Sequence, residues 1–306
     1  MNEALITIGI PVKNEEHNID SLLHNIIDQN YPHKFIEIIF VDDGCTDKTV
    51  YEINNILSNT SISYKILFSG GKGISYSRQM IINKAKGKYI LWVDADIKFK
   101  QDYIYKQVKY MENNPDVAIS RGKLIMIKEN YLLAKLQNLN MYLTSRKLRK
   151  SNNLFGICGS ICLTEALKRV GGFDIKIKGA GEDIDLIMKL SYKWKIGKND
   201  AIFYHPPYRN WQDLWRRSYW YGYGNHYVKS VHKETITLLN YIPFVSFMIG
   251  IKDIIQVIRL SRDFTAFFLP IEYFFQSSAW MIGYLQSHYD GYGHFNLKKP
   301  TNEQSL

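Results

Sequence analysis

Short apolar runs alternate with segments of helical periodicity along the first part of the chain. The runs predict strands at 5–12, 36–41, 64–68 and 89–94. The intervening segments place apolar residues three or four positions apart, and they predict helices at 18–27, 46–57 and 75–85. Strands that alternate with helices of about ten residues predict an α/β fold, a Rossmann-like, mostly parallel sheet with helices on both faces.

Carboxylates stand at the ends of two of these predicted strands. They are Asp42 with Asp43, and Asp94 with Asp96. Ligands of parallel sheets bind at the carboxyl ends of the strands, so we expect these acids to share one edge with Lys72, which lies in a glycine-rich turn. Such an oxygen-rich edge suits a divalent cation that holds a diphosphate. A solvated turn or a helix cap would explain either pair taken alone.

Two common nucleotide-binding patterns are absent from the sequence. The glycines at 70–73 lack the Gly-x-Gly-x-x-Gly spacing of a dinucleotide site, and the first strand runs into Pro11 to Glu15 instead of a glycine loop. No glycine and Lys-Ser/Thr set occurs at Walker spacing either. A nicotinamide site and a P-loop are therefore not expected.

Six motifs follow one another over roughly the first two thirds of the chain. They are Ile10–Glu15, Val41–Asp47, Ser77–Arg78 with Ala85–Ile90, Asp94–Asp96, Gly171–Asp174 and Gly181–Leu186. In this order they resemble an inverting glycosyltransferase of family 2, which has the GT-A fold. Cys45 stands where that family usually has serine and Ser77 where it usually has alanine, and both replacements are small.

The resemblance implies a donor site and a metal site. Its nucleotide pocket would be lined by Pro11, Val12, Asn14, Glu15, Asp43 and Asp94, with Lys72 and Arg78 contacting the nucleotide or its phosphates. Asp43 would accept a hydrogen bond from a base N–H or a ribose hydroxyl. Asp96, with Asp94 and His205, would hold Mn²⁺ or Mg²⁺ on the diphosphate, where the ion offsets charge on the departing nucleoside diphosphate.

The resemblance also implies a general base and an acceptor side. Asp183 would take the proton from the acceptor hydroxyl as it attacks the anomeric carbon, and Glu182, Trp215 and Arg216 would face the acceptor. Each role has a structural alternative. Asp183 also fits an acid in the first turn of a helix, and His205, which precedes two prolines, also fits a structural histidine. Glu15 would likewise start a helix, and Lys72 would be a solvated loop residue.

The composition changes beyond about residue 208, which suggests a division into domains. We predict a transferase domain at 1–207 (nucleotide half 1–100, acceptor half 101–207), a membrane-associated helical region at 208–290 and a polar tail at 291–306. A helical pattern at 129–153 ends in the cations of 146–150, which suit either a surface helix or a flap that meets the acceptor.

The membrane interpretation rests on two strongly apolar segments, Tyr241–Ile251 and Phe264–Leu285. The first is too short to span a bilayer, and the second contains Pro270, Glu272 and Gln276, so we expect helices that lie in the interface. A helical subdomain packed on the catalytic core is the alternative.

The Gln-x-x-Arg-Trp motif of processive synthases is absent, because Arg216 follows Gln212 by four positions. Single-sugar transfer is therefore favoured over a polysaccharide synthase subunit.

Charge and cysteine content narrow the partners and the compartment. The net charge of +10 favours anionic partners but does not choose among nucleotides, lipid headgroups and nucleic acid. The family resemblance implies a nucleotide-sugar donor and a glycan or lipid-linked acceptor, and binding of nucleic acid would have no need for Asp94 or Asp96. Three cysteines without metal spacing, and a start that lacks a basic segment before an apolar one, predict a reducing compartment without a secretory signal. We therefore expect the cytoplasmic face of the cell membrane. A non-catalytic sugar-nucleotide or glycan binding protein remains as a further hypothesis.

Overall fold

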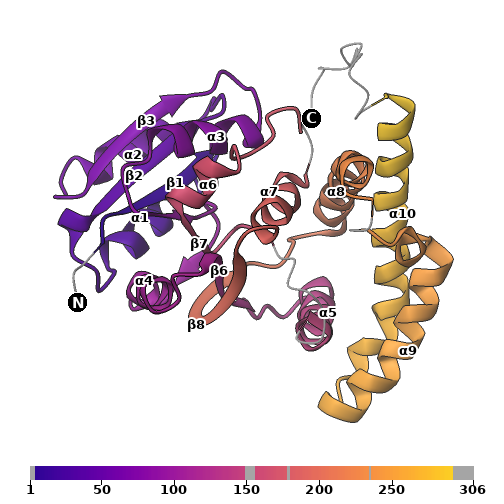
Figure 1. The fold of residues 1–306 in the computed structure, drawn as a ribbon. Helices are drawn as coiled ribbons and strands as arrows, with labels where there is room; N and C mark the ends of the chain where they lie inside the picture. Colours follow the sequence, from indigo (N-terminus) through magenta and orange to yellow (C-terminus); the bar gives the residue numbers. More distant parts are fainter. Residues whose placement is uncertain (1–3, 149–155, 178–179, 234–235, 292–306) are drawn as a thin grey trace. The chain divides into compact units, whose positions relative to one another are not determined.

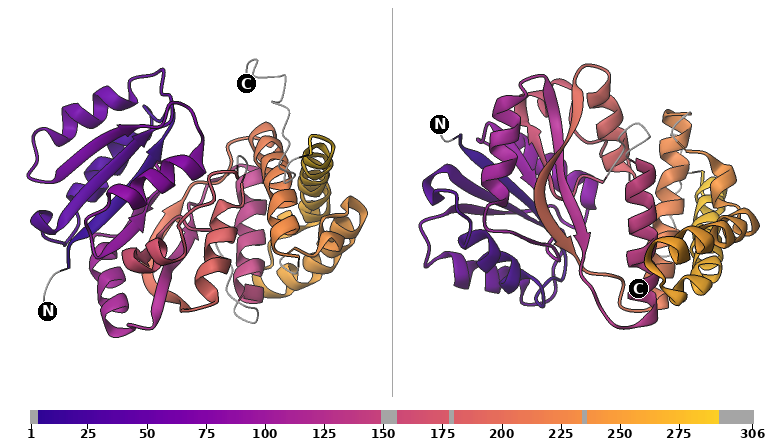
Figure 2. Two further views of the ribbon diagram at one scale, coloured as in Figure 1. Left: turned by 45° about the horizontal axis from the view of Figure 1, so that its top comes forward. Right: turned by 90° about the horizontal axis from the view of Figure 1, so that it is seen from below.

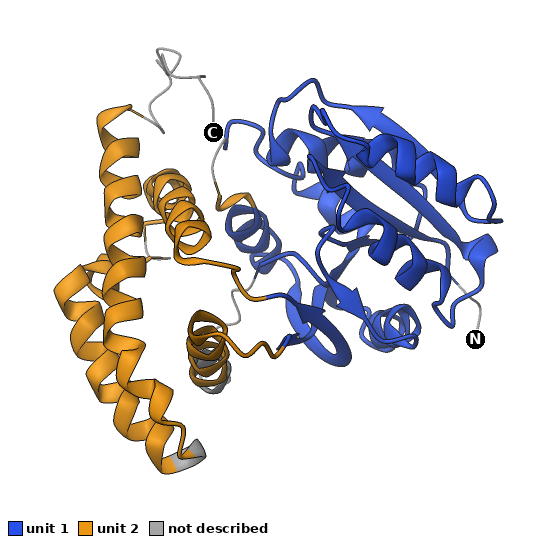
Figure 3. Cartoon of the chain, turned by 180° about the vertical axis from the view of Figure 1, so that it is seen from behind, with its two compact units in different colours: residues 1–127, 153–178, 183–206 blue, residues 128–152, 179–182, 207–306 orange. Residues whose placement is uncertain are grey.

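The computed structural model describes residues 4–148, 156–177, 180–233 and 236–291 (Figure 1). The chain divides into two compact units, which are coloured separately in Figure 3. Unit 1 comprises residues 1–127, 153–178 and 183–206, and unit 2 comprises residues 128–152, 179–182 and 207–306. The basic run at 146–150 lies outside the residues whose side chains are described.

The described strands of unit 1 form one sheet in the order β3-β2-β1-β4-β7-β6-β8-β5. They are β1 (Ile6–Val12), β2 (Ile36–Asp42), β3 (Ser63–Phe68), β4 (Tyr89–Trp92), β5 (Lys98–Phe99), β6 (Val117–Met126), β7 (Ser160–Leu163) and β8 (Lys195–His205). Strands β3, β2, β1 and β4 are parallel neighbours, as predicted. Strand β7 is antiparallel to both β4 and β6, and β8 is parallel to β6, so the other half of the sheet is mixed. Because β7 is antiparallel to both of its neighbours, β6 runs in the same direction as β4, and so does β8. The carboxyl ends of β4 and β8 therefore lie at the same edge of the sheet.

Helices cover both faces of this sheet (Figure 2). On one face lie α1 (Ile19–Ile27), α2 (Thr49–Leu57) and α4 (Tyr103–Asn113), and on the other α3 (Ile74–Lys84), α6 (Thr164–Arg169) and α7 (Glu182–Ser191). A short helix, η1 (His33–Phe35), precedes β2. Alternate side chains of one strand enter opposite cores: Leu91 packs with α1, and Trp92 packs with α3. Each fully buried aliphatic side chain contributes about 1.5–3 kcal/mol.

Helices make up unit 2. They are α5 (Leu132–Leu148), α8 (Trp211–Val231), η2 (Leu238–Tyr241), α9 (Pro243–Ser261), η3 (Phe264–Phe268) and α10 (Leu269–Tyr289). Helices α8 and α10 touch through glycines: a Cβ on Gly222 would lie 1.8 Å from the Trp280 carbonyl oxygen, and one on Gly283 would lie 2.0 Å from that of Tyr219. The two predicted apolar segments correspond to α9 and to η3 with α10. Within the described part of the chain, no helix is both long and apolar enough to cross a membrane.

Candidate functional site

The turn after β2 is fixed by Asp42. Its Oδ1 accepts hydrogen bonds from the backbone N–H groups of Gly44 (2.9 Å) and Cys45 (2.6 Å). Gly44 has a φ of 90°, a conformation that side chains rarely adopt. The Asp42 carboxylate is therefore engaged in holding the backbone, and Asp43 is the acid of this pair with capacity for a ligand.

Asp43 joins this turn to the loop before α3. Its buried carboxylate accepts hydrogen bonds at Oδ1 from the Gly73 N–H (2.9 Å), the Ser69 hydroxyl and the Ser77 hydroxyl (3.5 Å). All of these bonds reach Oδ1, and no described residue donates to Oδ2. The carboxylate is thus held in place with one oxygen available to accept a hydrogen bond from a ligand.

The loop after β1 is tied to the same region. Asn14 has a left-handed φ of 56°, and its Oδ1 accepts a hydrogen bond from the Thr46 N–H (2.8 Å). The Glu15 N–H donates to the Thr49 hydroxyl (2.8 Å). The Val12 side chain is buried in the core, and its carbonyl accepts a hydrogen bond from the Asp43 N–H (2.9 Å). Val12 therefore supports the position of Asp43, while the side chain of Pro11 beside it is partly exposed.

Arg78 and Asp94 form an ion pair beneath this edge. The Nη2 atom of Arg78, on α3, lies 3.1 Å from Oδ1 of Asp94, and the guanidinium lies over the Phe173 ring at 6.0 Å. Arg78 is 4% exposed, so its charge acts first on Asp94. Lys72 is exposed and its Nζ lies 4.7 Å from the centre of the Tyr76 ring. Lys72 is therefore the cation of this loop that can reach a phosphate.

Asp96 and His205 meet because β4 and β8 end at the same edge. Their Oδ2 and Nε2 atoms lie 3.6 Å apart, and Oδ1 of Asp96 is buried without a hydrogen-bond partner among the described residues. The His205 Nδ1 lies 2.7 Å from the Pro206 carbonyl, which in the neutral ring makes Nδ1 the donor and leaves the Nε2 lone pair toward Asp96. Two facing acceptors and an unsatisfied oxygen fit a divalent cation.

The protein supplies few ligands for such a cation. The described residues contain no group of three or more His, Cys, Asp or Glu side chains that could hold a metal ion. Asp94, the third predicted ligand, is paired with Arg78. Mg²⁺ commonly binds through one or two carboxylates together with substrate phosphates, so Asp96 fits a cation that arrives with a diphosphate, and Nε2 of His205 would add a nitrogen ligand.

Asp183 lies in the first turn of α7 and is partly buried. Burial raises the pKa of its carboxyl group, and the guanidinium groups of Arg78 and Arg121 oppose that rise. A helix N-terminus alone would lower the pKa of an acid. The loop before β7 approaches Asp183 closely, because a Cβ on Gly156 would lie 3.2 Å from Oδ2. A carboxylate whose affinity for protons is raised suits a general base.

Sequence reasoning missed two residues beside the carboxylates. Arg121, on β6, donates from Nε to the Cys158 carbonyl (3.0 Å) and lies over the Phe203 ring at 5.3 Å. Burial raises the pKa of the Cys158 thiol, and the charges of Asp94 and Asp96 raise it further, so Cys158 stays a neutral thiol. The signal for Arg121 is weak, because β6 also contains Ser120 and the cation Lys123, and sequence periodicity does not connect a residue of this strand to the carboxylates.

Of the residues predicted for the acceptor side, Glu182 begins α7, whereas Trp215 and Arg216 lie on α8. Glu182 is buried at the start of α7. On α8, the Trp215 ring packs edge-on against Phe275 with centroids 5.0 Å apart, and Arg216 pairs with Asp213 at 2.5 Å. Trp215 and Arg216 thus have contacts within unit 2 that account for their positions.

Comparison with known proteins decides the family. The model of the family described as "Glycosyl transferase family 2" matches residues 7–171, which contain Asp43, Asp94 and Asp96. The chain belongs to glycosyl transferase family 2. An uncharacterized glycosyltransferase of Haemophilus influenzae is 32% identical over 151 residues, which are 48% of this chain and 56% of that protein. The chain therefore matches little more than half the length of that relative.

Two further glycosyltransferases are similar over more of the chain. TuaG of Bacillus subtilis, provisionally described as a teichuronic acid biosynthesis glycosyltransferase, is 26% identical over 204 residues, covering 65% of this chain and 78% of TuaG. The mannosyltransferase PcManGT of Pyrobaculum calidifontis, solved with GDP-Man and Mn²⁺, superposes with a TM-score of 0.70 at 16% identity. The superposition covers 95% of this chain and 88% of PcManGT, and it confirms the predicted GT-A-like fold with its helical C-terminal region.

Proposed function

We propose that this protein is a metal-dependent inverting glycosyltransferase of the hexosyltransferase type. It moves a sugar from a nucleotide-sugar donor to a hydroxyl of a glycan or a lipid-linked saccharide. The observation that carries the proposal is that Asp43 and the Asp96–His205 pair follow strands of one sheet in unit 1, while Arg78 pairs with Asp94 and acts on the charge of Asp183. An inert binding protein would need neither Asp183 nor a cation-binding pair.

Each group has a distinct task in the proposed reaction. Asp43 accepts a hydrogen bond from the nucleoside, and Lys72 attracts the phosphates. Asp96 and His205 would hold the cation, which when bound offsets negative charge on the departing diphosphate. Asp183 takes the proton of the acceptor hydroxyl as the oxygen attacks the anomeric carbon. One base and one direct attack invert the anomeric configuration.

Ligand-dependent melting of the protein tests the donor and metal assignment. We expect one of UDP, GDP, CDP or dTDP to raise the melting temperature in the presence of Mn²⁺, because a ligand at 100 times its Kd stabilises a protein by about 2.7 kcal/mol. Asp96→Asn should remove the Mn²⁺-dependent part of the shift. Asp116→Asn, an exposed aspartate on the same unit paired with Lys195, is the matched control.

Two outcomes would contradict the proposal. An Mn²⁺-dependent shift that persists undiminished in Asp96→Asn would remove the metal assignment. A product whose anomeric configuration is retained, measured by NMR after transfer to an acceptor, would exclude the inverting mechanism.

We also propose that unit 2 holds the enzyme on the cytoplasmic face of the membrane, as a peripheral or monotopic protein. One exposed stripe of α9 is apolar and carries Phe244, Met248, Ile251 and Ile255. These residues recur at helical spacing, whereas Ser246 and Asp253 of the same helix are buried. An exposed apolar stripe suits a helix that rests in a lipid interface.

The same pattern continues into α10. The exposed apolar residues of η3 and α10 are Phe264, Phe267, Phe268, Ile271, Phe274, Ile282 and Leu285. Exposed cations, Arg259 and Arg262, stand between the two stripes along the chain. Cations beside apolar side chains favour anionic lipid headgroups as the surface that covers these helices.

A further inference from the structure

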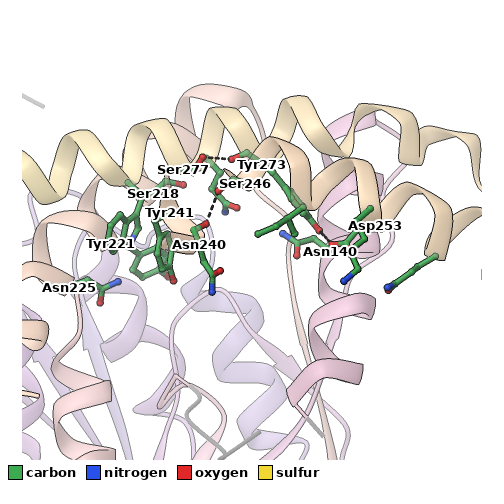
Figure 4. Close-up of a pocket in the computed structure, with 15 residues that line it drawn as sticks. Asn140, Ser218, Tyr221, Asn225, Asn240, Tyr241, Ser246, Asp253, Tyr273 and Ser277 are labelled. Carbon is green, nitrogen blue, oxygen red and sulfur yellow. Dashed lines mark hydrogen bonds between the residues drawn. The ribbon is translucent and has the colours of Figure 1, made fainter. Parts of the chain in front are cut away.

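Unit 2 contains a cavity that the donor and metal assignments do not use. It has a volume of about 620 Å³ and is lined by residues of α5, α8, η2, α9 and α10 (Figure 4). Figure 4 shows Tyr221, Asn225 and Tyr241 gathered toward one end, with Asn140 and Asp253 toward the other. The volume falls in the range of about 300–1,000 Å³ that small-molecule sites occupy.

The lining is rich in side-chain amides. Each of five helical elements contributes one, and these residues are Asn140, Asn225, Asn240, Gln256 and Gln276. An amide offers both donors and an acceptor, so the set can match hydroxyl groups, which also donate and accept. Among the described residues that line the cavity, Ile249 is the one aliphatic side chain, which makes a lipid tail a poor fit.

The charges of the lining cancel. Lys252 and Asp253 are its two charged residues among those described, and they have opposite signs. The Asp253 carboxylate also accepts a hydrogen bond from the Tyr273 hydroxyl (3.1 Å). A diphosphate or an anionic headgroup would find no excess of cations here. The cavity therefore favours an uncharged ligand rich in hydroxyl groups.

Aromatic side chains complete the lining. Tyr221 is 40% exposed, and the Tyr241 ring stacks on the ring of Trp280 at 3.9 Å. Trp280 is 3% exposed, and its stacked ring supports the ring of Tyr241 from within unit 2. Amides with aromatic rings match the polar rim and the apolar C–H face of a sugar ring.

We propose that this cavity binds an uncharged segment of a saccharide, so that unit 2 holds the acceptor glycan by a site of its own. The role of the glycan as the acceptor rests on the proposed transferase function, whereas the binding of a saccharide in the cavity does not. The ligand class is a short, neutral oligosaccharide. Tyr221 supplies the ring on which a sugar stacks, and the surrounding amides bind its hydroxyl groups.

Saturation-transfer NMR and calorimetry on the 306-residue chain test this site. The probes are neutral trisaccharides of glucose, mannose and N-acetylglucosamine, and glycerol 3-phosphate serves as the anionic comparison. We expect at least one trisaccharide to bind, and Tyr221→Ala to weaken it at least tenfold. Tyr142→Ala is the matched control, because Tyr142 is 41% exposed on a helix of the same unit and does not line the cavity.

Nucleoside diphosphate binding is measured in parallel on the same variants. Equal affinity of wild type and Tyr221→Ala for the saccharide would overturn the site, and so would binding of glycerol 3-phosphate but of no trisaccharide, or of no probe at all. A Tyr221-dependent saccharide signal without any nucleotide binding would uphold the cavity and count against the transferase proposal. Intact nucleotide binding in Tyr221→Ala shows that unit 1 of the variant is folded, and vesicle binding at the wild-type level shows the same for unit 2.

Discussion

Burial raises the pKa of Asp183 and that of Glu272, with different consequences. The charges of Arg78 and Arg121 limit the rise for Asp183, which suits its proposed role as a base. Glu272 is fully buried on α10, and neither of its oxygens has a hydrogen-bond partner among the described residues. The setting of each acid, rather than its residue type, therefore separates a chemical role from a structural one.

Asp183→Asn should fold and bind the donor but lose transfer. The amide keeps the shape of the side chain and cannot accept the proton, and a general base commonly contributes about a hundredfold or more to the rate. In the wild type, the raised pKa of Asp183 predicts that kcat falls as pH decreases, because the protonated acid is inactive. Steady-state kinetics across pH check both expectations, with Asp116→Asn as control. Transfer at the wild-type rate by Asp183→Asn would exclude this role.

Glu272 should make the protein less stable as pH rises. Burial raises the pKa of Glu272 from 4.5 to about 8. Between these two values the folded protein therefore keeps a proton that the unfolded chain releases. The contribution of neutral Glu272 to the free energy of unfolding is complete below about pH 4.5 and is lost as the pH approaches 8. Each pKa unit corresponds to about 1.4 kcal/mol.

Chemical denaturation of Glu272→Gln between pH 5 and 8 measures this effect. The neutral amide should flatten the decline in the free energy of unfolding relative to the wild type. Exposed Glu129 provides the control, since Glu129→Gln should leave the decline unchanged. Parallel curves for wild type and Glu272→Gln would show that Glu272 does not titrate in this range.

At the scale of elements, parallel strands and helix stripes determine where chemistry and surfaces lie. The parallel orientation of β4 and β8 brings Asp96 and His205 together although they are far apart in sequence. On α9, the polar stripe lines the cavity of unit 2, and the apolar stripe faces outward. One helix can therefore serve both a saccharide and a lipid surface.

The outward stripes should determine vesicle binding. We expect the wild type to sediment with phosphatidylglycerol vesicles, and Phe244→Ser with Phe267→Ser to reduce the bound fraction, because apolar area drives interfacial binding. Phe68→Ser is the matched control, since Phe68 in unit 1 is 67% exposed, close to the 70% of Phe244. Undiminished sedimentation of the double variant would refute the role of these helices in lipid binding.

At the scale of the whole molecule, the net charge of +10 does not locate a site by itself. The proposed donor edge is rich in acids, including Asp43, Asp94 and Asp96, which disfavour a nucleic acid backbone at that edge unless a cation is present. Exposed cations such as Arg259 and Arg262 instead accompany the apolar stripes of unit 2. The excess charge therefore favours an anionic surface there, and we expect the wild type to sediment less with phosphatidylcholine vesicles than with phosphatidylglycerol vesicles.

The sequence by itself determined the parallel half of the sheet and the edge where the acids lie. Periodicity is local, so the strand and helix patterns up to Asp94 could be read directly, with ends displaced by a few residues. The helix expected from residue 46 begins at Thr49, because Asp47 accepts hydrogen bonds from the N–H and hydroxyl of Thr49. The family motifs likewise made Asp43, Asp96 and Asp183 the candidate site residues without coordinates.

Only the tertiary structure decided which of these groups meet. The pairing of Arg78 with Asp94, the three donors on Asp43 and the presence of Arg121 beside Cys158 depend on contacts between distant segments. The same holds for the cavity, whose amides come from five separate elements, and for the pKa of Glu272. Burial and charge proximity are properties of packed neighbours, and a linear pattern does not specify which neighbours those are.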